Sequence, residues 1–113
     1  MVEATSLAGL TEQHLAIARQ VSSGRSAHTV RGGHDKMLRQ TLVALAGGRR
    51  LDEHENPGEA TLQVLHGNVR LVAGEQEQSG TTGDLLIIPG SRHSLEAVHD
   101  SVVLLTVAKP TRS

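Results

Sequence analysis

The spacing of turn residues after residue 26 is the feature that most constrains the fold. Short segments rich in Val, Leu, Ile and Thr alternate with turns every eight to twelve residues or so, a pattern typical of a β-sandwich or barrel. The predicted strands are residues 27–30, 37–45, 49–54, 61–66, 68–73, 84–88, 93–97 and 102–108. Gly67 and Asn68 indicate a tight hairpin, and the polar stretch 74–83 indicates a loop. The chain is therefore predicted to be all-β.

A short helix is predicted before the strands, over residues 11–20. Thr11 is a weak N-cap signal, and the Ser22-Ser23-Gly24 cluster ends the helical pattern. The same stretch could lie as an extended arm. Residues 1–35 are therefore assigned to a helix or arm that packs on the barrel or on a partner subunit, and residues 36–113 to the barrel.

The composition excludes several classes of partner. Eleven Lys and Arg balance twelve Asp and Glu, which predicts no nucleic-acid partner. The absence of Phe, Tyr and Trp removes the aromatic faces on which bases stack. The longest apolar runs fall far short of the ~20 residues that span a bilayer, and nothing near Met1 resembles a signal segment. With no cysteine present, a soluble cytoplasmic domain without a membrane partner is expected.

Two ordered motifs resemble those of a small single-domain cupin. Residues 48–67 read GRRLDEHENPGEATLQVLHG, which is similar to the first cupin motif: a glycine, a His-x-His pair, a Pro-Gly turn, an acidic ligand and Val-Leu-x-Gly. Residues 83–93 read GDLLIIPGSRH, which looks like the second motif, where a strand and a proline turn deliver a histidine. With the strands around them, the motifs cover about residues 37–108. The resemblance implies a jelly-roll β-barrel of six to eight strands, with a lumen open at one end.

In metal-binding cupins, two histidines and a glutamate of the first motif and the histidine of the second hold one divalent metal. The matching histidines here are His54 and His93, whereas Asn56 takes the place of the second histidine and Ala60 that of the glutamate. Glu59 lies one residue too early. We therefore expect His54, Asn56 and His93 to hold one transition metal (Fe, Mn, Ni, Zn or Cu), or the two histidines to be hydrogen-bonded lumen groups without a metal.

Strand parity gives the same grouping from the residues alone. His54 and Asn56 are two apart on a predicted strand, so their side chains share a face, and His93 follows a buried strand. Neutral imidazole is a common ligand of first-row transition metals.

Three more residues are candidates for the pocket. Gln63 has the parity of the opposite face unless a bulge intervenes, and Glu59 would reach the site only if the Pro-Gly turn shifts register. Arg39, if it faces the lumen, would favour an anionic ligand.

The remaining histidines are predicted to have no chemical role: His14, His28, His34, His66 and His99.

The function expected first is binding of a small molecule in the lumen, with or without a divalent metal. A metal-dependent enzyme of the dioxygenase, isomerase or decarboxylase kind, using His54 and His93, is the alternative. A non-enzymatic sensor or interaction protein, with the N-terminal residues as its arm, is a further one. Because bare strand edges tend to pair with another chain, and because cupins are often dimers, a homodimer is expected.

Overall fold

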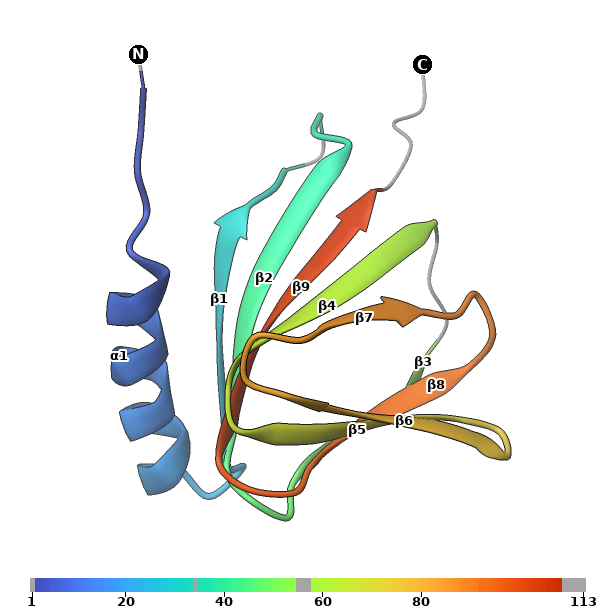
Figure 1. The fold of residues 1–113 in the computed structure, drawn as a ribbon. Coiled ribbons are helices and arrows are strands. Elements are labelled where there is room, and N and C mark those ends of the chain that lie inside the picture. Colours follow the sequence, from blue (N-terminus) through green and yellow to red (C-terminus); the bar gives the residue numbers. More distant parts are fainter. Residues whose placement is uncertain (1, 34, 55–57, 109–113) are drawn as a thin grey trace.

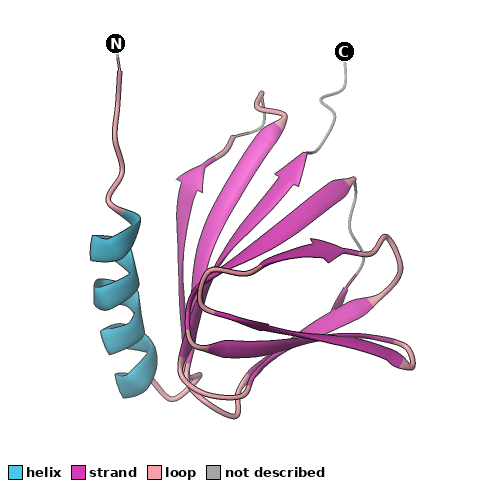
Figure 2. Ribbon diagram, viewed as in Figure 1, coloured by secondary structure: helices cyan, strands magenta, loops and turns pink. Residues whose placement is uncertain are grey.

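The computed structural model describes residues 2–33, 35–54 and 58–108, with the backbone alone for Glu53 and His54. One helix stands beside two sheets that face each other (Figure 1, Figure 2). The helix is α1 (Leu7–Gln20), and the strands are β1 (Arg25–Arg31), β2 (Leu38–Leu45), β3 (Arg50–His54), β4 (Glu59–His66), β5 (Asn68–Ala73), β6 (Gln76–Thr81), β7 (Leu85–Ile88), β8 (His93–Ala97) and β9 (Ser101–Ala108).

The strands form a five-stranded sheet in the order β1-β2-β9-β4-β7 and a four-stranded sheet in the order β3-β8-β5-β6. Every pairing between neighbours is antiparallel. The chain crosses repeatedly from one sheet to the other and does not complete one sheet before starting the next, as in a jelly roll. The prediction of an all-β barrel is confirmed.

Gly67 marks a crossing between the sheets, and the predicted hairpin there is wrong. β4 pairs with β7 and β9, whereas β5 pairs with β6 and β8. Gly67 has φ +96°, and a Cβ at this position would collide with the carbonyl oxygen of Asp100 and the side chain of Ser101. Glycine is required here by both the backbone angle and the close approach of another chain segment.

The predicted loop over residues 74–83 contains a strand that the sequence did not reveal. β6 pairs with β5 along its whole length, from Ala73 opposite Gln76 to Asn68 opposite Thr81. Of its residues, Gly80 alone is buried. The strand is polar because it forms the edge of its sheet, so it has no apolar alternation by which to recognise it.

The helix begins one turn before the predicted start. Ser6, not Thr11, is its N-cap, and the Ser6 hydroxyl oxygen accepts a hydrogen bond of 3.0 Å from the backbone N–H of Gly9. The sequence assigned residues 1–35 to the helix or arm, and this part of the chain also contains β1. β1 is an edge strand of the larger sheet.

The larger sheet separates two apolar clusters. The lumen cluster joins the inner faces of both sheets and contains Val43, Leu45, Ala60, Leu62, Val64, Val69, Leu71, Leu86, Ile88, Leu95, Ala97 and Val103. The helix-side cluster lies on the opposite face of the larger sheet, under α1, and contains Leu15, Ala18, Leu42, Ala44, Val102 and Leu104. Along β2, alternate residues belong to alternate clusters, as the two-residue repeat of a strand requires.

Candidate functional site

His93 begins β8, and its side chain is buried inside the barrel with 2% of the residue exposed. Its Nδ1 lies 2.9 Å from the carbonyl oxygen of Ser91. Because a carbonyl oxygen only accepts hydrogen bonds, Nδ1 carries the proton and the lone pair of the neutral ring is on Nε2. In this tautomer Nε2 can accept a hydrogen bond or coordinate a metal.

An irregularity in β3 brings the backbone of His54 opposite that of His93. Leu51 pairs with Leu95, and after a shift of register His54 pairs with His93. Three residues of β3 therefore span the distance of two residues of β8, which is a β-bulge. The sequence placed His54 and His93 at one site, and their backbones are paired. The third predicted ligand, Asn56, lies outside the described residues.

The lumen beside His93 encloses a cavity of about 20 Å³. Its described lining is His93 together with the aliphatic side chains of Val43, Leu51, Leu62, Leu71, Ile88, Leu95, Val103 and Leu105. A cavity needs about 10–15 Å³ to hold one water molecule. The described lumen thus has room for about one water-sized species.

The three further candidates of the sequence do not line this cavity. Gln63 is exposed on β4, on the face opposite to the buried Ala60, as its parity predicted. Glu59 is exposed and lines a separate hollow of about 580 Å³, together with Thr61 and Ile87. Arg39 is half-buried near the start of β2, and its Nε donates to the carbonyl oxygen of Lys36 at 3.4 Å.

A groove lies between β6 and β7, at the open side of the barrel. Within the described chain, β6 pairs only with β5 and β7 only with β4, so the two strands present free edges to each other. They meet at Gly80, where a Cβ would lie 3.1 Å from the Leu86 side chain, and separate toward the turn between β5 and β6 (Figure 1). The groove has a volume of about 430 Å³ and is lined by Leu71, Ala73, Gln76, Glu77, Gln78, Ile87 and Pro89.

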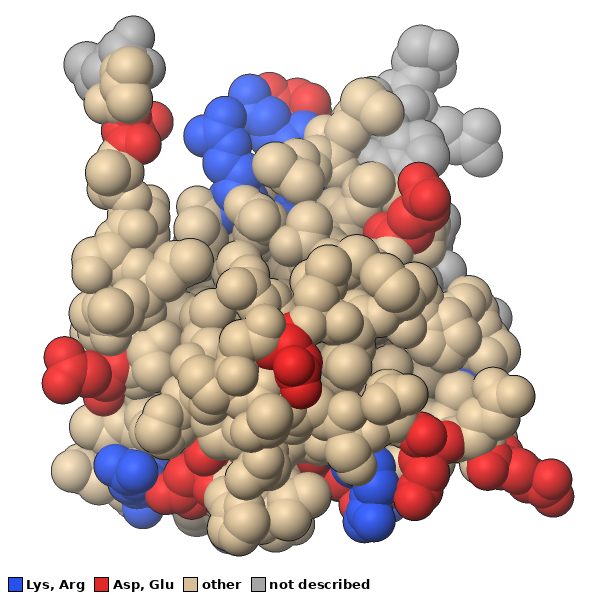
Figure 3. Space-filling view, in the orientation of Figure 1, with Lys and Arg blue, Asp and Glu red and all other residues tan. Residues whose placement is uncertain are grey.

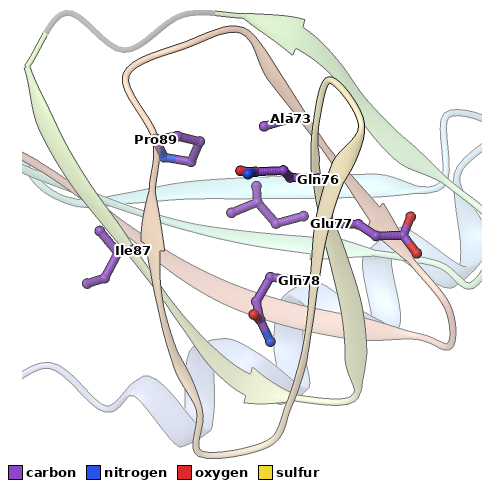
Figure 4. Close-up of a pocket in the computed structure, with 7 residues that line it drawn as sticks. Ala73, Gln76, Glu77, Gln78, Ile87 and Pro89 are labelled. Atoms are coloured by element: carbon purple, nitrogen blue, oxygen red, sulfur yellow. The ribbon is translucent and has the colours of Figure 1, made fainter.

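The side chains of the groove combine amides with apolar groups (Figure 4). Gln76 points across the groove toward Pro89, whereas the carboxylate of Glu77 points away from it. Leu71 lines both the groove and the lumen cavity, so it separates the ligand-sized space from His93.

Charges of both signs are interspersed on the face of the molecule in Figure 3. Arg70 and Glu96 form an ion pair of 2.8 Å, and this hydrogen bond raises the pKa of Arg70, so its guanidinium stays charged. At the base of α1, the hydrogen bond from Arg19 and the backbone N–H of Gly47 lower the pKa of Asp100. Both pairs are on the surface and outside the groove.

Several solved structures resemble this one. A conserved protein of unknown function from Streptococcus pyogenes is 25% identical with a TM-score of 0.72, over 81% of this chain and 80% of that one. An RmlC-like cupin protein from Desulfovibrio desulfuricans is 21% identical with a TM-score of 0.72, over 96% of this chain and 97% of that one. A cupin superfamily protein from Desulfitobacterium hafniense is 16% identical with a TM-score of 0.70, over 76% and 78% of the two chains.

This chain has the cupin fold. The resemblance of its two motifs to those of cupins is thereby confirmed at the level of the fold. No family model matches the sequence, and no curated protein matches it. The described part of the chain contains no helix that is both long and apolar enough to cross a membrane.

The described donors of this chain do not make up a metal centre. Ala60, at the position of the expected carboxylate, is buried in the lumen cluster and has no ligating atom. Within residues 2–33, 35–54 and 58–108 no group of three or more His, Cys, Asp or Glu is placed to hold a metal ion. The predicted ligand set of His54, Asn56 and His93 stays a prediction.

The groove was missed because residues 74–83 were predicted to be a loop. The sequence contains no signal for this strand: every residue of Gln76–Thr81 is polar or glycine, so no apolar alternation marks its two faces.

Proposed function

We propose that this cupin is a binding module for a small organic molecule, and that the molecule lies in the groove between β6 and β7. The observation that carries the proposal is a groove of ligand size whose lining combines amides with apolar side chains. Small-molecule sites are commonly clefts of about 300–1,000 Å³. The groove, at about 430 Å³, is within this range, whereas the lumen cavity of about 20 Å³ is not.

The lining of the groove favours an uncharged ligand with an apolar body and one or two hydrogen-bonding groups. Leu71, Ala73 and Pro89 supply apolar surface, and the amides of Gln76 and Gln78 each donate and accept hydrogen bonds. The charged lining residue, Glu77, turns its carboxylate away (Figure 4). The apolar side chains and the two amides can therefore bind a ligand that carries no charge.

Thermal unfolding in the presence of a panel of short aliphatic alcohols, amides and lactones tests the proposal. A member of the panel that binds the native state raises the midpoint of unfolding, because binding stabilises that state by about 2.7 kcal/mol when the ligand is at a hundred times its Kd. We expect the Gln76→Ala/Gln78→Ala double variant to bind such a molecule about tenfold or more weakly.

Gln63→Ala is the matched control, because it removes an exposed amide from the outer face of β4. It should leave binding unchanged. Equal losses in the control and the double variant, or full binding by the double variant, would place the ligand elsewhere and refute the proposal.

Metal analysis separates this proposal from a metal-dependent activity. Plasma mass spectrometry of the purified protein is expected to find no metal whose amount depends on His93. A near-stoichiometric first-row metal that is present in the wild type and lost in His93→Ala would favour the metal-dependent alternative.

A further inference from the structure

A cluster of polar side chains lies on the other side of the larger sheet, between α1 and β1. His14 of α1 is 7% exposed, and its Nδ1 lies 2.6 Å from the hydroxyl oxygen of Ser26 on β1. The ring centre of His28, two residues further along β1, is 5.4 Å from that of His14, and the planes are tilted by 46°. His28 is exposed, so the cluster is open to solvent on one side.

The spacing of the two rings is that of imidazoles on one metal ion. A zinc–imidazole bond is about 2 Å long, and the nitrogen lies about 1 Å from its ring centre, so two rings on one ion have centres about 5–6 Å apart. The hydrogen bond between Nδ1 of His14 and the Ser26 hydroxyl is of the kind that orients a ligating imidazole and directs its other nitrogen to the metal.

A further polar group under the helix has no partner. The hydroxyl oxygen of Thr11 is buried and makes no hydrogen bond to the described residues. Thr11 precedes His14 by three positions, so the two side chains share a face of α1. An ion with bound water beneath this face would offer the hydroxyl a hydrogen-bond partner.

We propose that His14 and His28 form a divalent transition-metal site that joins α1 to β1, with Ser26 orienting His14 and water filling the remaining positions. Imidazole nitrogen suits Zn²⁺, Ni²⁺ and Cu²⁺. The site is separate from the lumen, because the larger sheet lies between the helix-side cluster and the lumen cluster that contacts His93. The ion would stabilise the packing of the helix on the sheet.

Titration with NiCl₂, followed by the midpoint of thermal unfolding and by paramagnetic broadening in NMR spectra, tests the site. We expect Ni²⁺ to raise the midpoint and to broaden amide signals of residues around 14 and 28. His28→Ala, which changes an exposed side chain and should fold normally, is expected to weaken binding at least tenfold. Ser26→Ala is expected to weaken it about tenfold while both ligands remain.

His66→Ala and His99→Ala serve as controls, because both change exposed histidines outside the α1–β1 cluster: His66 at the end of β4 and His99 between β8 and β9. Both variants should bind Ni²⁺ like the wild type. A response that survives in His28→Ala, a response that disappears in His66→Ala or His99→Ala, or the absence of any response in the wild type would overturn the proposal. None of these results bears on ligand binding in the groove.

Discussion

The two faces of the larger sheet bury similar aliphatic side chains but treat polar groups differently. The lumen face meets a second sheet, and its cavity has a single polar side chain, that of His93, in its described lining. The outer face meets α1, and there His14, Ser26 and His28 form a polar cluster open to solvent on one side. A space closed by two sheets favours apolar filling, whereas the margin of a docked helix admits groups that water can still reach.

Shortening one buried leucine on each face of the larger sheet should give the largest losses of stability and show how the two faces differ. Leu62, on the lumen face, and Leu15, under the helix, are 3% and 6% exposed. Leu62→Ala is expected to lower the free energy of unfolding by about 3–4 kcal/mol, and Leu15→Ala by about 2 kcal/mol. The cost at Leu15 is smaller because α1 can shift into the cavity left by the truncation, whereas the two sheets around Leu62 cannot. Urea denaturation of both variants measures this. Equal losses would show that the helix is held as rigidly as the sheets.

A pair of glycines tests how tightly the chain closes the lumen where it crosses between sheets. Gly67 and Gly83 have nearly the same φ, +96° and +95°. A Cβ added at Gly67 would collide with Asp100 and Ser101, whereas a Cβ added at Gly83 would have no atom within 4 Å. Gly67→Ala should cost about 3 kcal/mol of unfolding free energy and Gly83→Ala about 1 kcal/mol. The difference isolates the close approach, since the backbone strain is shared. Similar costs would argue against the tight crossing.

Asp100 should have the smallest effect, and it belongs to the helix side. Its carboxylate accepts bonds from Arg19 of α1 at 2.7 Å and from the backbone N–H of Gly47 at 2.8 Å. The pair is on the surface, so Asp100→Asn should cost only about 0.5 kcal/mol near neutral pH.

The pH dependence of that effect follows from the direction of the shift. The Arg19 bond lowers the pKa of Asp100 in the folded state. Its contribution is therefore present at pH values above the ordinary Asp range and is lost as the pH falls through the lowered pKa. The stability difference between wild type and Asp100→Asn should shrink below about pH 4. Glu12→Gln is the control, because it changes an exposed carboxylate of α1 without removing such a bond. A difference that stays constant down to pH 2 would contradict this role of Asp100.

The sequence predicts the barrel well because apolar alternation and turn residues are local signals. Eight of the strands were expected close to where they lie, but β6 has no apolar alternation and was missed. The same absence concealed the groove, whose amides lie on that strand. The polar cluster of His14, Ser26 and His28 could not be predicted, since it depends on how α1 docks on β1, a contact between segments that sequence patterns do not position.

The position of a bound ligand decides between the groove and the lumen as the binding site. Two-dimensional ¹H–¹⁵N NMR of the wild type can be recorded during titration with the panel member that raises the unfolding midpoint most. Binding in the groove predicts that the largest amide shifts occur in β6 and β7 and at Leu71 of β5. Largest shifts in β3 and at His93, with β6 unchanged, would place the ligand in the lumen and contradict binding in the groove.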